Sequence, residues 1–143
     1  MKILIINGVN LDMLGKRDAA VYGTDTLKEL NKKIAAYARR RSIKTKFLQH
    51  SCEGVLAKII THNTADALIL NAGAYSHYSY ALRDAIECCN KPVVEVHLTD
   101  ITKREDFRKN RVFDGVVAAC YFGKGINSYF DAIDFLSQNC KLD

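Results

Sequence analysis

MKILIINGVN (residues 1–10) opens the chain and decides its fold. Ile3 to Ile6 form a short continuous apolar run that ends at the turn-forming pair Asn7-Gly8. A strand that is apolar on both faces is typical of a parallel sheet covered by helices, because both of its faces are buried. The run is too short for the hydrophobic region of a signal peptide and no small-residue cleavage site follows it, so we expect a first strand here.

Working outward from this strand, the chain alternates apolar runs with helical patterns. Thr26 and Glu29 have the spacing of a capping box, which marks the start of the first long helix. Alternating strands and helices predict a flavodoxin-like α/β fold, a five-stranded parallel sheet with helices on both faces. Further strands are expected at 43–49, 67–70, 92–96 and 116–122, long helices at 26–41, 53–63, 76–89 and 128–139, and a short helix at 103–109.

The composition indicates one ordinary globular domain over residues 1–143. Hydrophobic residues make up 48% and charged residues 26% of the chain, which excludes a disordered protein. No stretch approaches the roughly 18 consecutive apolar residues of a membrane span. The five cysteines are odd in number and lack CxxC spacing, so we expect no metal site and a reducing compartment, the cytoplasm. The net charge of +5 is spread among acidic residues, which favours an anionic small substrate over nucleic acid.

Polar side chains collect where the predicted strands end, which is where parallel sheets bind ligands. Asn7 and Asn10 also suit a simple turn, and Asn71 a helix cap. The stretch 9–25 is the longest without an expected element, and a loop of that length in a small domain is usually functional. The strand-end residues are Asn7, Asn10, Arg17 and Tyr22 after the first strand, Asn71, Gly73 and His77 after the third, and Glu95, His97, Thr99, Arg104 and Arg108 at and after the fourth.

Glu95 and His97 form the most distinctive pair in this set. Glu95 interrupts a run of valines in a strand that we expect to be buried, where an unpaired carboxylate is costly. Residues two apart on a strand share a face, so the carboxylate lies beside the imidazole and fixes its tautomer. The pattern predicts an acid/base histidine held by a glutamate, and the alternative is a paired ion couple in the core. No GxGxxG or GxxxxGK[ST] loop is present in a strand-to-helix turn.

Four blocks resemble the type II 3-dehydroquinases over nearly the whole chain: NGVNLDMLGKRDAAVYG (7–23), NAGAYSHYSYALRDA (71–85), VEVHLTDITKREDFRK (94–109) and GKGINSY (123–129). The resemblance implies a lyase that dehydrates 3-dehydroquinate to 3-dehydroshikimate by anti elimination through an enolate, without metal or cofactor. It also implies a homododecamer of four trimers. Two rivals are a non-catalytic homologue that binds a cyclic carboxylic acid and a related lyase that acts on a different cyclic acid.

The same resemblance implies the catalytic roles. Tyr22 looks like the base that removes a proton from C2, and Arg17, on the same mobile lid, would favour the Tyr22 phenolate. Asn10 would hold a water at the enolate oxygen. His97, oriented by Glu95, would protonate the departing C1 hydroxyl.

Substrate binding is assigned by resemblance to further positions. Asn71, with the backbone amides of Leu98 and Thr99, would take the substrate carboxylate. The ring hydroxyls would contact His77 and Arg108, and Asp84 would reach the site of a neighbouring subunit.

The chain departs from the family pattern in two regions. Val9 and Ala19 stand where the family usually has proline, and we expect this to loosen the lid. After Arg108 the family continues through His-Ser-Tyr, whereas here residues 109–112 read KNRV. We expect hydroxyl contacts and trimer packing to change there.

Overall fold

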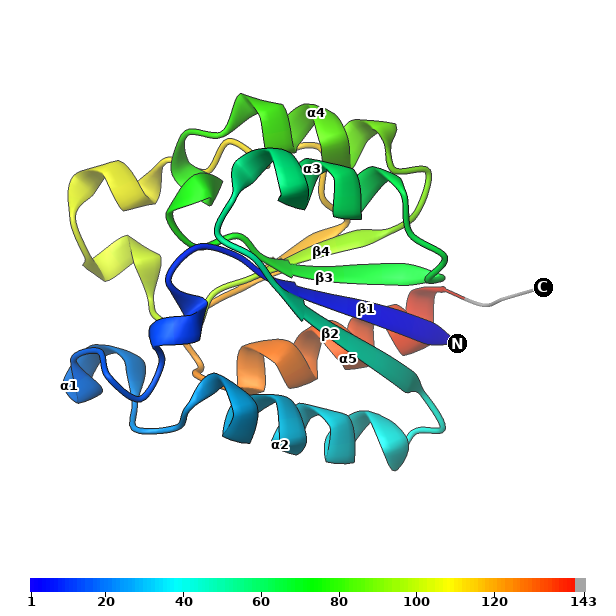
Figure 1. The fold of residues 1–143 in the computed structure, drawn as a ribbon, viewed down its shortest axis with the longest axis horizontal. Helices are drawn as coiled ribbons and strands as arrows, with labels where there is room; N and C mark the ends of the chain where they lie inside the picture. The colour runs from blue at the N-terminus through cyan, green and yellow to red at the C-terminus, as the bar shows by residue number, and fades with distance from the viewer. Residues whose placement is uncertain (141–143) are drawn as a thin grey trace.

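The computed structural model describes residues 1–140 as a parallel sheet between two helical layers (Figure 1). The strand order is β2-β1-β3-β4-β5, the flavodoxin-like arrangement, so the expected fold class is confirmed. Helices α2 (Leu27–Arg39) and α5 (Asn127–Asn139) cover one face, and α3 (Glu53–Thr61) and α4 (Tyr80–Cys88) cover the other. The strands are β1 (Lys2–Asn7), β2 (Lys44–Gln49), β3 (Ala67–Asn71), β4 (Val93–Val96) and β5 (Ala119–Tyr121).

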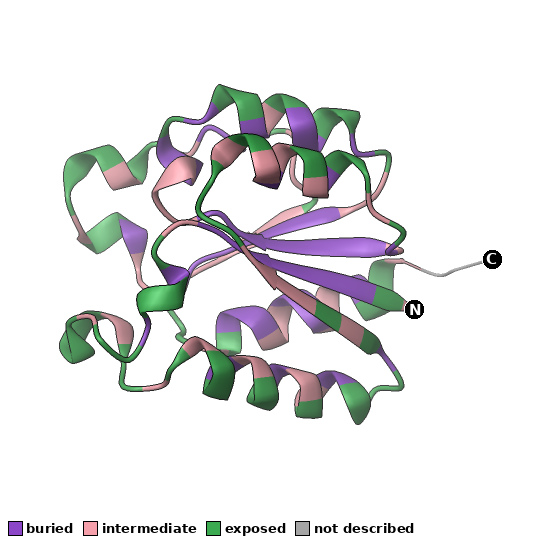
Figure 2. Cartoon of the chain, in the orientation of Figure 1, coloured by how far each residue is buried: buried purple, intermediate pink, exposed green. Residues whose placement is uncertain are grey.

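The core is divided by the sheet into two clusters, one on each face. Ile3 and Ile5 of β1 belong to the cluster under α2 and α5, whereas Leu4 and Ile6 belong to the cluster under α3 and α4. This alternation follows from the two-residue period of a strand. Figure 2 shows the central strands as the most buried part of the molecule. The continuous apolar run at the start of the chain therefore has the buried position that it predicted.

The capping box expected at residue 26 begins α2. The Thr26 hydroxyl accepts from the Glu29 amide at 3.2 Å, and the Glu29 carboxylate accepts from the Thr26 amide at 2.8 Å. These two bonds satisfy amides that the first turn leaves without helical partners. Within residues 1–140, no helix has the length and apolar character needed to cross a bilayer.

Two of the expected helices are interrupted. The helix predicted at 76–89 starts as a 3₁₀ turn, η2 (Gly73–His77), and α4 begins only at Tyr80 because the Ser79 hydroxyl caps it by accepting from the Leu82 amide at 3.0 Å. The short helix predicted at 103–109 is two 3₁₀ turns, η3 (Ile101–Lys103) and η4 (Asp106–Lys109), separated by the extended backbone of Arg104.

Two further segments differ from expectation. The strand predicted at 116–122 is reduced to β5, because the Val116 and Val117 amides donate to the Phe113 carbonyl in a turn. The loop at 9–25 contains two short helical elements, η1 (Leu11–Met13) and α1 (Ala19–Tyr22). The second of these carries Tyr22, so the expected loop is a structured support for a site residue.

Candidate active site

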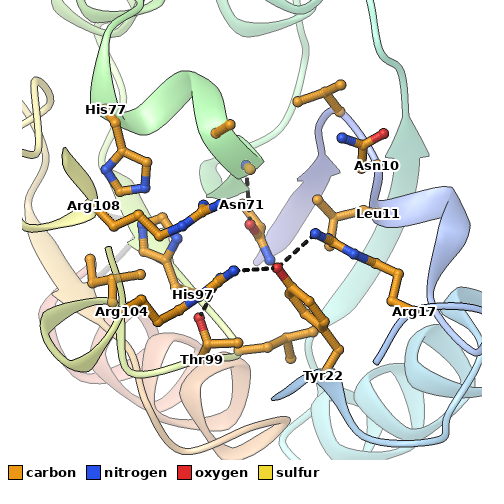
Figure 3. Close-up of a pocket in the computed structure, with 15 residues that line it drawn as sticks. Asn10, Leu11, Arg17, Tyr22, Asn71, His77, His97, Thr99, Arg104 and Arg108 are labelled. Atoms are coloured by element: carbon orange, nitrogen blue, oxygen red, sulfur yellow. Dashed lines mark hydrogen bonds between the residues drawn. The ribbon is translucent and has the colours of Figure 1, made fainter. Parts of the chain in front are cut away.

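A pocket lies at the carboxyl ends of β1, β3 and β4, where the strand order reverses between β1 and β3 (Figure 3). Glu95 lies against His97 beneath the pocket, and Asp84 lies outside it, exposed on α4. The sequence-predicted residues that line the pocket are Asn10, Arg17, Tyr22, Asn71, His77, His97, Leu98, Thr99 and Arg108.

Tyr22 points into the pocket from α1, which begins at its N-cap Asp18. Its hydroxyl oxygen accepts from Arg17 Nη2 at 2.6 Å and from Arg104 Nη2 at 2.8 Å. The Arg17 guanidinium also stacks over the Tyr22 ring, 3.6 Å from the centroid. Arginine is charged throughout the physiological pH range, so both donors stabilise negative charge on the shared oxygen.

Arg104 is the pocket residue for which the sequence indicated no role. It follows η3, and its Nη1 donates to Thr99 Oγ1 at 3.3 Å while Nη2 reaches Tyr22. In the sequence, only its position after the fourth strand pointed to the pocket, and neighbouring basic residues have a similar position. The bond to Tyr22 joins positions 82 residues apart, a pairing that a local pattern does not predict.

The loop after β1 brings Asn10 to the pocket rim. Asn10 has a left-handed backbone, with φ 65° and ψ 2°, which asparagine tolerates better than most residues. Position 8, two residues earlier, requires glycine because a Cβ there would lie 2.6 Å from the Ala72 carbonyl oxygen. The Asn-rich turn expected after the first strand thus has both a structural part and a pocket-facing part.

Glu95 and His97 form the expected pair on β4. His97 Nε2 lies 2.7 Å from Glu95 Oε1, and both side chains are almost completely buried. Burial alone would raise the pKa of Glu95, but hydrogen bonds from His97 and from Arg111 outweigh it and hold the pKa below its ordinary value. The ionised carboxylate only accepts, so Nε2 carries the proton and Nδ1 is left for the substrate.

His77 is held as a neutral hydrogen-bonding group. Its Nδ1 lies 2.7 Å from the Asn110 carbonyl oxygen, which accepts, so Nδ1 is protonated and Nε2 is an acceptor. Burial lowers the pKa of His77 and the bond to Asn110 opposes this only in part. The rings of His77 and His97 stack with centroids 5.9 Å apart. A neutral imidazole beside the proton donor suits a substrate hydroxyl.

Asn71 is fixed at the end of β3 by a buried network. Its Nδ2 donates to the Tyr129 hydroxyl at 2.9 Å, and that hydroxyl donates to Asn7 Oδ1 at 2.7 Å. Burial raises the pKa of Tyr129, so the phenol stays neutral and keeps both bonds. One hydrogen of Asn71 Nδ2 remains. Within residues 1–140, no protein group accepts a hydrogen bond from the amides of Leu98 and Thr99.

The pocket is electropositive. Arg17, Arg104 and Arg108 line it, and within the part of the chain that the structure describes its lining includes no Asp or Glu. Arg108 is oriented by Glu105, whose carboxylate accepts from its Nε at 2.6 Å. Converging cations raise the local concentration of anions, so the pocket suits a small anionic ligand.

The fold and the pocket together define an α/β enzyme suited to proton transfer on a small anionic substrate. The chain belongs to the dehydroquinase class II family, whose model matches residues 1–137, and the resemblance drawn from the sequence is confirmed. The 3-dehydroquinate dehydratase of Pelotomaculum thermopropionicum is 42% identical over 135 residues, covering 93% of this chain and 94% of that protein. That of Syntrophotalea carbinolica is 40% identical over 145 residues, covering 99% and 98%. A crystal structure of a type II dehydroquinase from Butyrivibrio crossotus superposes with a TM-score of 0.91 at 37% identity, covering 95% of this chain and 97% of the other.

Proposed function

We propose that the chain dehydrates 3-dehydroquinate to 3-dehydroshikimate. One observation carries the proposal: the Tyr22 oxygen, held by two guanidinium groups, shares a pocket with the His97–Glu95 couple. An elimination next to a ketone needs a base for the α-proton and a separate acid for the departing hydroxyl. The family to which the chain belongs supports the same reaction.

The steps follow from these two groups. The Tyr22 phenolate takes the proton from C2, and the C2–H electron pair forms the enolate of the C3 ketone. Donors around the new oxyanion stabilise it, which is usually the largest electrostatic contribution. The enolate then collapses to the C1–C2 double bond, and the C1 hydroxyl leaves as water with a proton from His97. The overall change is loss of one water, and Tyr22 and His97 exchange protons with solvent to reset the site.

The remaining lining residues bind and orient the substrate in this proposal. Asn71 and the free amides of Leu98 and Thr99 take the carboxylate, and this role is supported by the unused hydrogens described above. His77 and Arg108 bind the ring hydroxyls. Asn10 holds a water beside the enolate oxygen.

A direct assay tests the function. Purified protein is mixed with 3-dehydroquinate, and the ultraviolet absorbance of the conjugated enone product is followed. We expect saturable turnover. Saturable binding of 3-dehydroquinate without any product would instead indicate a non-catalytic homologue, and turnover of only another cyclic hydroxy acid would indicate a related lyase.

We further propose that the reaction needs no metal, cofactor or lysine imine. Each step above is carried by side chains of the pocket, and no lysine lines it in the part of the chain that the structure describes. Full activity should therefore survive prolonged treatment with a chelator, and also borohydride reduction in the presence of substrate. Irreversible loss on borohydride treatment would contradict the mechanism.

We also propose a homododecamer of four trimers in the cytoplasm, with residues 1–143 as one domain; residues 141–143 lie outside the described part. Asp84 is exposed on α4, which suits a residue that completes a neighbour's site. The cysteines at 52, 88, 89, 120 and 140 are all free thiols, which supports a reducing compartment.

A further inference from the structure

The carboxylate behind His97 has a second partner outside the pocket. The Glu95 side chain is fully buried, and its Oε1 already accepts from His97. Its other oxygen, Oε2, accepts from Arg111 Nη2 at 2.9 Å and from Arg111 Nε at 3.2 Å. Burying a carboxylate is costly unless it is paired with a cation and its lone pairs accept hydrogen bonds. Arg111 supplies the charge that compensates Glu95 even when His97 is neutral.

Arg111 comes from the segment that departs from the family pattern. The segment is anchored because the Val112 amide donates to the Ser76 carbonyl at 2.9 Å. Arg111 Nη1 pairs with Asp114 Oδ1 at 3.0 Å, and Asp114 is largely exposed. A line of alternating charge thus runs from the surface through Asp114, Arg111 and Glu95 to His97.

We propose that Arg111 is a positioning residue that sets the pH at which the Glu95–His97 couple releases its proton. The inference rests on the proposed function, because it concerns the acid of that reaction. Two strongly coupled groups titrate as a unit, so the charge beside the couple controls the shared proton. With Arg111 in place, the carboxylate stays compensated after His97 has given its proton to the substrate.

The sign follows from the charges. Removing Arg111 leaves the buried Glu95 anion with His97 as its main cationic partner, which favours the protonated couple, and it removes a cation that repels the imidazolium. Both effects make the couple hold its proton to higher pH. Other groups around the couple act on both forms but are unchanged by the substitution. Those facing it from neighbouring elements are His77 and Arg108, the thiol of Cys120, whose pKa is raised to about 12 by burial, and Asp114 behind Arg111.

The test is the pH profile of kcat/KM in Arg111 variants. In Arg111→Met the high-pH limb of the profile should shift to higher pH by about one pH unit, as expected for loss of an adjacent charge. Arg111→Lys, which keeps the charge, should retain the wild-type limb. Arg111→Gln keeps a donor for Oε2 and loses the charge, so it should shift like Arg111→Met and serves if the methionine variant does not fold. Arg41→Met is the matched control, because it removes another arginine–carboxylate pair, with Asp134, and neither residue lines the pocket or contacts Glu95.

A second pair of variants tests whether Arg111 acts on His97 through Glu95. In a Glu95→Gln background only the direct repulsion between Arg111 and the imidazolium remains, so adding Arg111→Met should move the limb by less than in the wild type. An equal shift in both backgrounds would overturn the proposal. So would a lower rate at every pH with an unmoved limb, which is the result for a merely structural arginine.

A titration without substrate separates failure of this inference from failure of the proposed function. The titration midpoint of the His97 ring, followed by NMR of ¹³C-labelled histidine without substrate, should rise in Arg111→Met even if the wild type does not turn over 3-dehydroquinate. The signal is assigned with His97→Gln. An unchanged midpoint would overturn the inference, whereas an inactive wild type with a raised midpoint would overturn only the proposed reaction.

Discussion

At the scale of single residues, the site depends on one oxygen that receives two charged donors. Arg17 comes from the loop at 9–25 and Arg104 from the segment after β4, and both reach the Tyr22 hydroxyl. These two bonds therefore join the loop after β1 to the segment after β4 across the pocket (Figure 3).

Tyr22→Phe removes the proposed base while keeping the ring under the Arg17 guanidinium. Loss of a general base costs about 10²–10⁴-fold in rate, and we expect kcat to carry the loss with KM little changed. Steady-state kinetics with 3-dehydroquinate measures both constants. A phenylalanine variant that kept more than roughly a tenth of the wild-type kcat would rule out Tyr22 as the base.

The two arginines should be partly redundant. Arg17→Ala leaves Arg104 on the Tyr22 oxygen, and Arg104→Ala leaves Arg17, so each single variant keeps one charged donor. The double variant should lose more in kcat than the two single losses combined, because the oxygen then has neither donor. A double-mutant cycle on kcat measures this coupling, and strictly additive losses would contradict a shared role.

At the scale of elements, the sequence predicted what local patterns encode. The apolar runs located the strands, although the run at 116–122 predicted a longer strand than β5, and Thr26 with Glu29 marked the start of α2. Glu95 and His97 were paired correctly because two residues on one strand share a face. Arg104 and Arg111 were not assigned, since their partners are far along the chain and contact depends on how 3₁₀ turns arrange the segment after β4.

Two glycines, one beside the pocket and one in an open helix position, give a matched test of how tightly the backbone packs around the pocket. Gly73, in η2, has φ +64° and a Cβ there would lie 2.6 Å from the Val9 carbonyl oxygen, beside the loop that carries Asn10. Gly73→Ala should destabilise the fold by roughly 1 kcal/mol or more, from the left-handed backbone alone. Gly54→Ala, in α3, meets no atom within 4 Å and should stabilise the fold by about 0.5–1 kcal/mol. Urea unfolding of both variants checks the opposite signs, and equal effects would contradict the packing described.

At the scale of the whole molecule, the surface of a single chain carries exposed apolar side chains that contact with a second copy would bury. Large apolar side chains are exposed beside the pocket, on the segment from η2 into α4 and on η4. Such exposed groups mark contact surfaces when they cluster. The residues are Tyr78, Tyr80 and Phe107, exposed by 59%, 68% and 57%. Asp84 lies one helical turn along α4 from Tyr80, so a subunit docked on this surface would receive both.

Assembly and activity should therefore be lost together. Light scattering should give a mass near twelve times that of the 16.1 kDa chain. Tyr80→Glu places a charge in the proposed contact and should yield smaller species with lower kcat, because closed assemblies lose each copy of a damaged interface at once. Lys32→Glu, an exposed charge change on α2 across the sheet, is the control and should alter neither. Asp84→Asn should lower kcat in an intact assembly if, as proposed, this carboxylate completes the neighbouring site. A fully active monomer at micromolar concentration would refute the interdependence.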